Sequence, residues 1–323
     1  MTRVAVTGIS GFTGSALVKQ LLKEGYQVNA LARRSIEIPV EKNLNIFEGD
    51  LGCSNTLFEM VNGADTVFHI AAMYRSEGSY DDFYKVNVEG TMALLHASQS
   101  AGVRRFVYCS TIGVHGNVAH TPADENTPFN PRDFYQETKL IAEKACKEES
   151  GKGIEIVIIR PCAIYGPGDT RMLKMFKMLN KGIFFFVGNG QPNFHPVYID
   201  DLVKGFILAM TVKSAAGETF IIGGPRYMSL REYVAAAANA IQVPNPKLKI
   251  PYSLMSFAAW LCETICAPLG IQPPLHRRRL TFFKHNRAFD ITKAKTLLGY
   301  KPRFELNDGF NETVAWYKQQ GLL

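Results

Sequence analysis

A glycine-rich turn between the first predicted strand and the first predicted helix constrains the fold more than any other feature of the sequence. The short β-type run Arg3–Val6 leads into Thr7-Gly8-Ile9-Ser10-Gly11-Phe12-Thr13-Gly14, and a helix-like segment from Ser15 to Glu24 follows. The stretch 26–31 has the composition of a second strand. This order of strand, turn, helix and strand is the setting in which spaced glycines predict a dinucleotide site.

Each glycine of the turn has its own predicted role. Gly8 permits the tight turn, Gly11 lets a pyrophosphate approach the backbone, and Gly14 lets the helix pack closely against the strand. The beginning of the helix then offers free N–H groups and the positive end of its dipole to the phosphates. The other predicted contacts of the turn are Ser10, Phe12 and Thr13.

Strand-like and helical stretches alternate through the first half of the chain. The predicted strands are Val4–Thr7, Val28–Leu31, Asn45–Phe47, Thr66–Ile70, Phe106–Cys109 and Glu155–Ile159. The predicted helices are Gly14–Glu24, Thr56–Val61, Phe83–Ser100 and Phe134–Glu149. Such alternation is typical of an α/β fold, a doubly wound parallel sheet with helices on both faces, whose ligands bind at the carboxyl ends of the strands.

The alternation ends near residue 165. The sequence predicts a dinucleotide-binding domain over residues 1–165, to which segments near 195–225 return. Residues 166–323 are predicted to form mainly a smaller, mostly helical substrate-binding lobe. Further predicted helices are Met172–Asn180, Asp201–Met210 and Leu230–Ile241.

Composition favours a cytoplasmic enzyme. The 323 residues are 46% hydrophobic, which suits a sizeable core, and the chain begins with a strand rather than a secretory signal. The six cysteines are scattered, mostly inside apolar runs, as in a reduced protein. Cys262 and Cys266 have no neighbouring His or Cys pair, so no metal site is predicted. The net charge of +7 comes without a nucleic-acid motif, and a phosphate-bearing cofactor explains part of it.

The most apolar stretch is Leu254–Ile265, in a segment bounded by Pro251 and Pro268. The segment is marginal for a bilayer span, which needs ~20 residues. We therefore favour a core helix, or a lid over an apolar substrate pocket, above a helix that lies on a membrane surface. The membrane reading stays open because an arginine cluster, 277–279, follows.

Tyr135 and Lys139 lie four residues apart in a stretch of good helix formers without Gly or Pro, so they share one helix face. A phenol with a pKa near ~10 is a poor base at neutral pH. A lysine ammonium one turn away favours the phenolate and lowers that pKa. The pair is therefore a candidate for proton transfer at a hydroxyl or carbonyl group.

Several motifs together resemble the extended short-chain dehydrogenase/reductase family over most of the chain. They include the glycine turn, Gly49-Asp50-Leu51, Phe68-His69-Ile70-Ala71-Ala72, Val86-Asn87-Val88-x-Gly90-Thr91, Ser110-Thr111-x-x-x-x-Gly116, Tyr135-x-x-x-Lys139 and Arg160-Pro161-x-x-x-Tyr165-Gly166-Pro167-Gly168. The resemblance implies a Rossmann-type fold, a nicotinamide cofactor and a common homodimeric assembly.

The resemblance also implies roles for single residues. Thr111 would hydrogen-bond the substrate oxygen, with Ser110 as a second candidate, and Tyr135 would be the acid/base. Lys139 would lower the pKa of Tyr135 and hold the nicotinamide ribose. The residues predicted to contact the cofactor are Gly8, Ser10, Gly11, Phe12, Thr13, Gly14, Arg33, Arg34, Asp50, Leu51, Ala71, Ala72, Asn87, Ser110, Tyr135, Lys139, Pro161 and Ile164. The histidines His69, His115 and His195 are interpreted as packing or loop residues.

Charge at the end of the second strand favours NADP(H) over NAD(H). An acid there would bind a free ribose diol, whereas arginine accepts a 2′-phosphate. The sequence has Ala32 at the expected acid position, followed by Arg33 and Arg34. A bidentate phosphate partner is therefore available and the carboxylate is absent.

The chain lacks polar residues that two reaction types of the family use, which reduces the number of possible reactions. Sugar dehydratases of the family carry Asp-Glu where this chain has Ile112 and Gly113, so dehydration is disfavoured. Nucleotide-sugar epimerases carry Asn and Arg where this chain has Ala163 and Phe194, which leaves a less polar pocket. The epimerase reading stays open because another arginine, Arg278 or Arg287, would be a substitute contact.

Several less specific motifs are most similar to those of the 3β-hydroxysteroid and 4-carboxysterol dehydrogenase branch. They are the strand 194–201, the turn Gly223-Gly224-Pro225-x-Tyr227, the apolar stretch before Pro273-Pro274, and the ending 293–302. The expected substrate is a sterol-like or β-keto acid-like small molecule with a secondary alcohol or ketone.

Overall fold

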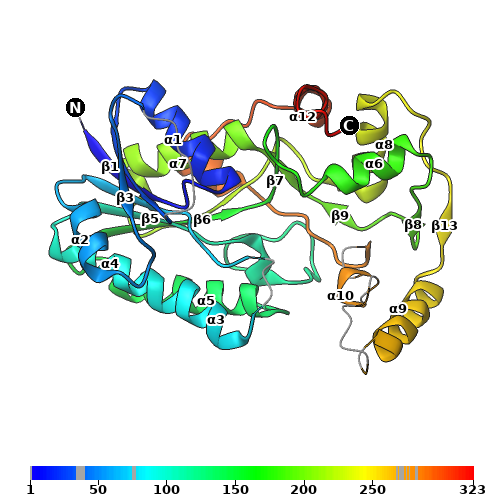
Figure 1. Cartoon of the computed structure of the whole chain (residues 1–323), viewed down its shortest axis with the longest axis horizontal. Coiled ribbons are helices and arrows are strands. Elements are labelled where there is room, and N and C mark those ends of the chain that lie inside the picture. The colour runs from blue at the N-terminus through cyan, green and yellow to red at the C-terminus, as the bar shows by residue number, and fades with distance from the viewer. Residues whose placement is uncertain are drawn as a thin grey trace.

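The computed structural model describes residues 2–33, 41–74, 78–266, 268, 273, 275, 277–280 and 283–323, without the side chains of 278 and 279. Its centre is a seven-stranded sheet in the order β11-β6-β5-β4-β1-β2-β3, and every neighbouring pair is parallel (Figure 1). These strands are β1 (Arg3–Thr7), β2 (Gln27–Ala32), β3 (Leu44–Glu48), β4 (Thr66–His69), β5 (Arg105–Cys109), β6 (Glu155–Pro161) and β11 (Thr219–Ile222). The predicted doubly wound α/β fold is confirmed.

Helices cover both faces of this sheet (Figure 1). One face carries α1 (Phe12–Lys23) and α7 (Ile199–Thr211). The other carries α2 (Ser54–Val61), α4 (Gly90–Ser100) and α5 (Phe134–Glu149).

Alternation of side chains along β1 separates two cores. Val4 and Val6 pack with Leu17 beneath α1, whereas Ala5 points to the opposite face and packs with Leu57 of α2. All of these side chains are fully buried. Because both faces of the strand are covered, its sequence is continuously apolar, which is why the strand can be predicted from the sequence.

The prediction of one regular α-helix over Phe83–Ser100 is wrong, because the segment is helical but not α-helical throughout. The structure has α3 (Tyr80–Tyr84), a π-helical segment at Lys85–Glu89, and then α4. The Asn87 side chain lies in the π-helical segment, where its Oδ1 accepts from the Met73 N–H at 2.7 Å and its Nδ2 donates to Thr138 Oγ1 at 3.0 Å. These contacts fix Asn87 between the loop after β4 and helix α5, and such π-segments recur at functional sites.

Short strands and helices make up the rest of the described chain. The strands outside the main sheet are β7 (Ala163–Tyr165), β8 (Phe186–Val187), β9 (Asn193–Phe194), β10 (Pro196–Tyr198), β12 (Met228–Ser229) and β13 (Lys249–Ile250). The remaining α-helices are α6 (Leu173–Asn180), α8 (Leu230–Ala240), α9 (Tyr252–Cys266), α10 (Arg277–Leu280), α11 (Thr292–Leu297) and α12 (Leu306–Gln319). Short 3₁₀ turns lie at Ile112–His115 and Lys213–Ala215.

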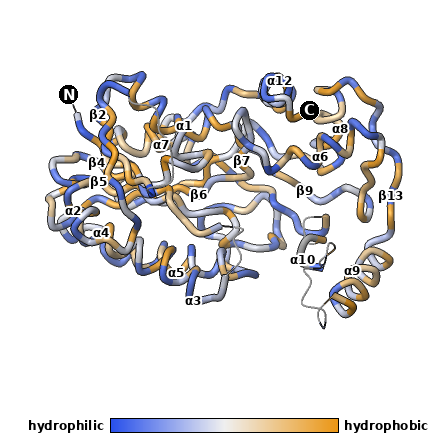
Figure 2. Tube along the Cα trace, in the orientation of Figure 1, coloured by the Kyte–Doolittle hydropathy of each residue, from blue (hydrophilic) through white to orange (hydrophobic). Residues whose placement is uncertain are grey.

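The apolar stretch Leu254–Ile265 is helical, as α9, but it is not the core helix that we favoured. Ala259 is its one buried side chain among the described residues. Hydrophobic residues predominate along α9 (Figure 2). Nowhere in the part of the chain that the structure describes is a helix both long and apolar enough to cross a membrane.

Candidate active site

The glycine turn connects the end of β1 to α1 at the centre of the sheet. Gly8 has a φ of +84°, and a Cβ there would lie 2.8 Å from the Ala71 nitrogen. A Cβ at Gly14 would lie 2.0 Å from the Gly8 oxygen, so this position admits glycine alone. Both glycines are therefore required by close backbone approaches within the protein.

Gly11 differs from these two glycines. A Cβ at Gly11 would meet the Gly8 oxygen at 3.4 Å, an ordinary contact, so the described protein leaves space beside it. Gly11 is also the N-cap of α1 and offers no side-chain cap, which leaves N–H groups of the first helical turn for a ligand. An open glycine at an uncapped helix N-terminus fits a pyrophosphate.

The order in which the chain adds strands to the sheet reverses beside this turn. From β1 the chain passes to β2 and β3 on one side, and β4, β5 and β6 continue on the other side of β1. The crevice at the carboxyl ends of β1 and β4 is therefore a topological switch point, where α/β sheets bind their ligands.

A buried chain of hydrogen bonds fixes the segment after β4 against the turn. Thr7 Oγ1 lies 2.7 Å from His69 Nδ1 and accepts from the Ile70 and Ala71 N–H groups at 3.2 Å. On the far side of the ring, His69 Nε2 lies 2.9 Å from Thr91 Oγ1. Burial lowers the pKa of His69 well below its ordinary value, so the ring is neutral. His69 therefore has the packing role expected from the sequence.

Other predicted cofactor residues lie at the same edge of the sheet. Asp50 follows β3, and its Oδ1 accepts from the Gly52 N–H at 2.8 Å. Leu51 packs against Gly90, where a Cβ would lie 2.7 Å from the leucine side chain. The exposed Arg33 follows β2, whereas Arg34 lies outside the described residues. Ala72, Pro161 and Ile164 follow β4, end β6 and lie in β7, respectively.

Thr111 and Tyr135 come together at the end of β5. Thr111 follows β5, Tyr135 lies in the first turn of α5, and the Thr111 hydroxyl is close enough to the phenol to lower its pKa. The Thr111 hydroxyl also accepts from the Gly113 N–H at 3.0 Å, which orients it. Lys139 is buried one turn along α5, with its Nζ 4.0 Å from the centre of the Tyr108 ring.

Burial dominates the proton affinities of this pair. It raises the pKa of Tyr135, and the nearby Thr111 hydroxyl opposes that rise. It lowers the pKa of Lys139 to about 8. The sequence predicted that Lys139 lowers the pKa of the phenol; in the protein alone the desolvation of Tyr135 is the larger influence, so the phenol is protonated at neutral pH.

The buried Lys139 should therefore leave a signature in the pH dependence of stability. Its pKa is about 8 when folded and 10.5 when unfolded, so the unfolded chain binds more protons between these values. The contribution of Lys139 to the free energy of unfolding then rises with pH across that window and is least favourable below pH 8. Lys139→Met should raise the free energy of unfolding at pH 7 by about 3 kcal/mol and abolish the rise. Urea unfolding of both proteins at pH 7 and pH 10 measures the two free energies of unfolding. The same change with pH in both proteins would contradict the prediction.

Sequence reasoning missed a buried ionic cluster behind Thr111. Arg160 of β6 donates from Nε to Glu143 Oε2 at 3.1 Å and forms a second contact to Oε1 at 2.5 Å. Ser110 Oγ donates to the same carboxylate at 2.6 Å. Its hydroxyl is thus engaged by Glu143 and is unavailable as a substitute for Thr111. The spacing 135, 139, 143 along one helix face is the signal that would have pointed to Glu143.

Tyr74 and Arg171 were also missed. The Tyr74 ring centre lies 4.7 Å from that of Tyr135, and the Tyr74 hydroxyl lies near the Arg171 guanidinium. The Arg171 guanidinium lies 5.6 Å from the Phe12 ring and is paired with Asp169 at 2.7 Å. These contacts connect Tyr135, the glycine turn and the loop after β7.

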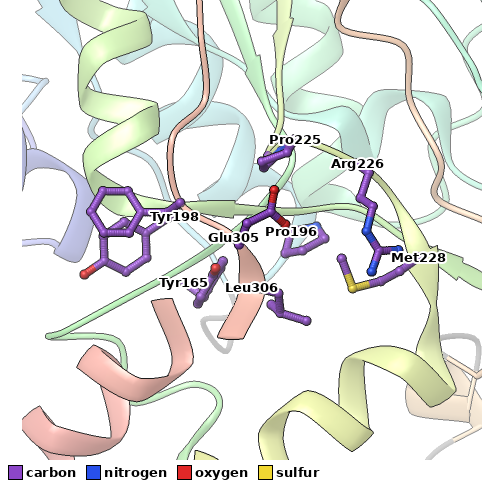
Figure 3. A pocket seen from close by; sticks show the side chains of 10 residues that line it. Tyr165, Pro196, Tyr198, Pro225, Arg226, Met228, Glu305 and Leu306 are labelled. Carbon is purple, nitrogen blue, oxygen red and sulfur yellow. The ribbon is translucent and has the colours of Figure 1, made fainter. Parts of the chain in front are cut away.

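A separate small cavity lies beside β7 and β10, next to the start of α12. Its lining includes Tyr165, Tyr198, Arg226 and Glu305, and its volume is about 10 Å³ (Figure 3). A water molecule is the largest occupant for this volume. The cavity includes none of the predicted catalytic residues, so it is a packing gap between elements.

Comparisons with known proteins show the family of the chain. The family model for the NAD dependent epimerase/dehydratase family matches residues 4–223. A 3 beta-hydroxysteroid dehydrogenase/Delta 5→4-isomerase of Mycobacterium tuberculosis is 33% identical over 98% of this chain and 90% of that protein. The mouse sterol-4-alpha-carboxylate 3-dehydrogenase (decarboxylating) is 28% identical over 97% of this chain and 90% of its own.

Solved structures show the same architecture. The crystal structure of gox2253 matches with a TM-score of 0.84 and 30% identity over the full length of both chains. MoeE5 in complex with UDP-glucuronic acid and NAD has a TM-score of 0.77 at 24% identity, over 98% of this chain and 99% of its own, which is a likeness of fold. The chain therefore belongs to the NAD dependent epimerase/dehydratase family of extended short-chain dehydrogenases/reductases, and it is an oxidoreductase with a nicotinamide cofactor.

Proposed function

We propose that the protein transfers hydride between NADP(H) and a secondary alcohol or ketone on an apolar, sterol-like or β-keto acid-like substrate. The observation that carries the proposal is the closeness of the Thr111 and Tyr135 hydroxyls beside buried Lys139, at the carboxyl end of β5. A hydroxyl pair at this edge of the sheet suits proton exchange with an oxygen atom of the substrate.

In this proposal the residues divide the work at the substrate oxygen. The Thr111 hydroxyl orients that oxygen, and Gly113 keeps the threonine in place. In reduction the protonated Tyr135 gives its proton to the oxygen; in oxidation the deprotonated Tyr135 takes the proton of the alcohol. Lys139 on the next turn supports the tyrosine and holds the cofactor ribose. The nicotinamide, when bound, supplies or accepts the hydride at its C4.

The packing around Phe194 supports an apolar substrate. Phe194 stands where nucleotide-sugar epimerases have an arginine, and its ring packs on Tyr233 with centres 4.6 Å apart. It is 8% exposed, so it offers no polar contact to a diphosphate. Two similar proteins, a 3 beta-hydroxysteroid dehydrogenase/Delta 5→4-isomerase and a sterol-4-alpha-carboxylate 3-dehydrogenase, support the same substrate class.

A cofactor-consumption screen tests the proposal. Sterols, β-keto acids and UDP-sugars are each incubated with the protein and with both NAD(H) and NADP(H), and absorbance of the reduced nicotinamide is followed. We expect net oxidation or reduction with a member of the first two classes. The alternative, a nucleotide-sugar epimerase, predicts conversion of a UDP-sugar without net change in absorbance and with a tightly retained cofactor. That result would overturn the proposal.

The preference for NADP(H) is tested at Arg33. The exposed Arg33 directly follows β2, and Ala32 stands at the position where an NAD-binding acid is expected. A 2′-phosphate therefore has a cationic partner there and no carboxylate to repel it. Arg33→Ser should raise the KM for NADPH about tenfold and leave the KM for NADH unchanged. Lys42→Ser, another exposed cation on the loop before β3, is the matched control. Equal changes for both coenzymes would exclude Arg33 as the 2′-phosphate contact.

A further inference from the structure

Helix α9 has two apolar faces, and the protein covers one of them. Tyr252, Met255 and Ala259 lie on the inner face and pack with Val187 of β8 and Leu280 of α10. The opposite face carries large apolar side chains that stay exposed. These are Leu254, Phe257, Trp260, Leu261 and Ile265, with exposed fractions from 44% to 59%.

The exposed side chains form a continuous stripe. Residues 254, 257, 261 and 265 follow the spacing of one helix face, and Trp260 flanks them with its ring 5.7 Å from that of Phe257. Single exposed apolar residues are ordinary on a soluble protein, but a run of five along one helix marks an interaction surface. Since the inner face is the one that packs on the protein, we expect a partner outside the chain to cover the stripe.

The surroundings of the stripe are basic. Lys247 and Lys249 are exposed just before α9, and exposed Lys284 lies 5.4 Å from the Tyr252 ring at the start of the helix. Strand β13, which contains Lys249, pairs with β8, and so joins α9 to the loop after α6, which holds the exposed Ile183. These elements lie together at one end of the molecule (Figure 1).

Acidic residues are missing from the segments that build this end. The stretches 170–199 and 233–262 contain no Asp or Glu. A groove of about 390 Å³ along α6 is lined by Lys174, Lys177 and Lys181, together with Met178 and Ile183. Glu263, the first acid after Tyr233, is paired with Arg277 at 2.7 Å.

We infer that this end of the lobe docks on the surface of an anionic lipid bilayer, with the outer stripe of α9 immersed among the lipids. Apolar side chains, including Trp and Phe, beside exposed lysines are the features of a helix that lies in the membrane interface. A second copy of the chain fits less well, because the stretch 233–262 offers no acidic residue to face these lysines across a two-fold contact. The inference goes beyond the proposed reaction and does not depend on it.

Vesicle flotation tests the inference with the full chain and no substrate. One set of vesicles is pure phosphatidylcholine, and in the other about a third of the lipid is phosphatidylglycerol. We expect the protein to float with the anionic vesicles and to stay largely unbound with the neutral ones. Absence of binding to anionic vesicles at low salt would overturn the inference.

Two variants separate the apolar and the basic contributions. Phe257→Asp/Leu261→Asp should lower binding to anionic vesicles by more than tenfold, and Lys247→Gln/Lys249→Gln should lower it roughly thirtyfold. The matched controls, Phe58→Asp and Lys42→Gln/Lys204→Gln, change exposed residues of the main domain and should bind like the unchanged protein. Circular dichroism of each variant verifies that it is folded.

The opposite outcomes are equally definite. If the α9 variant binds vesicles as well as the unchanged protein, the stripe is not the docking surface. If gel filtration shows a dimer that Phe257→Asp/Leu261→Asp dissociates, and the unchanged protein ignores anionic vesicles, a second copy covers the stripe. Neither outcome bears on hydride transfer, which the cofactor-consumption screen tests separately.

Discussion

Tyr135→Phe is expected to lower kcat by about a thousandfold while the Kd of NADPH stays within about twofold. The change removes the hydroxyl that we propose exchanges a proton with the substrate and that lies close to the Thr111 hydroxyl. It keeps the ring, whose centre is 4.7 Å from that of Tyr74, so the local packing survives. Steady-state absorbance of NADPH, with a substrate found by the screen, gives kcat, and quenching of protein fluorescence gives the Kd.

Tyr80→Phe is the matched control. Tyr80 lies in α3 and packs against Phe134 with ring centres 5.6 Å apart, so the variant loses a phenolic hydroxyl near the same helix but outside the site. Its kcat should stay within about twofold of the original. If Tyr135→Phe retained more than about a tenth of the turnover, another group would be the acid and the proposed mechanism would be wrong.

Glu143→Ala should lower the free energy of unfolding by about 3–5 kcal/mol, the largest stability change that we expect. The carboxylate neutralises Arg160 inside the protein, where both side chains are fully buried, and it also accepts the Ser110 hydroxyl. Arg160 holds the pKa of Glu143 below its ordinary value, and the alanine leaves a buried guanidinium without its counter-charge. Urea unfolding followed by circular dichroism measures the loss.

Two variants serve as controls for the loss of stability at Glu143→Ala. Ser110→Ala removes one hydrogen bond of the cluster and should cost about 1 kcal/mol. Glu148→Ala changes an exposed glutamate on the same helix and should stay within about 0.5 kcal/mol. A loss at Glu143→Ala no larger than that at Glu148→Ala would show that water reaches and compensates Arg160.

The sheet could be predicted because its strands are buried on both faces. Val4, Ala5 and Val6 face two different cores, so the sequence is apolar without interruption, and the glycine turn then marks the end of the strand. The π-helical segment could not be predicted in this way. Asn87 is fixed there by Met73 and Thr138, and the pairing of Asn87 with Thr138 spans 51 positions of the chain.

The site was predicted only as far as its motifs extend. Thr111 and Tyr135 follow a family pattern, whereas Glu143 and Arg160 are charged residues that a reading by polarity assigns to the surface. Helix α9 is the converse: its apolar sequence favoured a core position, yet its outer face is exposed. Hydropathy shows that a side chain avoids water, but it does not identify what covers it.

The position of β11 has a consequence for how the chain folds as it is synthesised. Strand β6 ends at Pro161, but its outer neighbour begins at Thr219, so the edge of β6 stays open until that later segment has been made. At about 5–20 residues per second this interval lasts on the order of seconds. An unpaired, apolar edge strand readily pairs with other chains. The nascent protein is therefore most prone to aggregate during this interval, and a chain shortened before Thr219 would keep that edge open permanently.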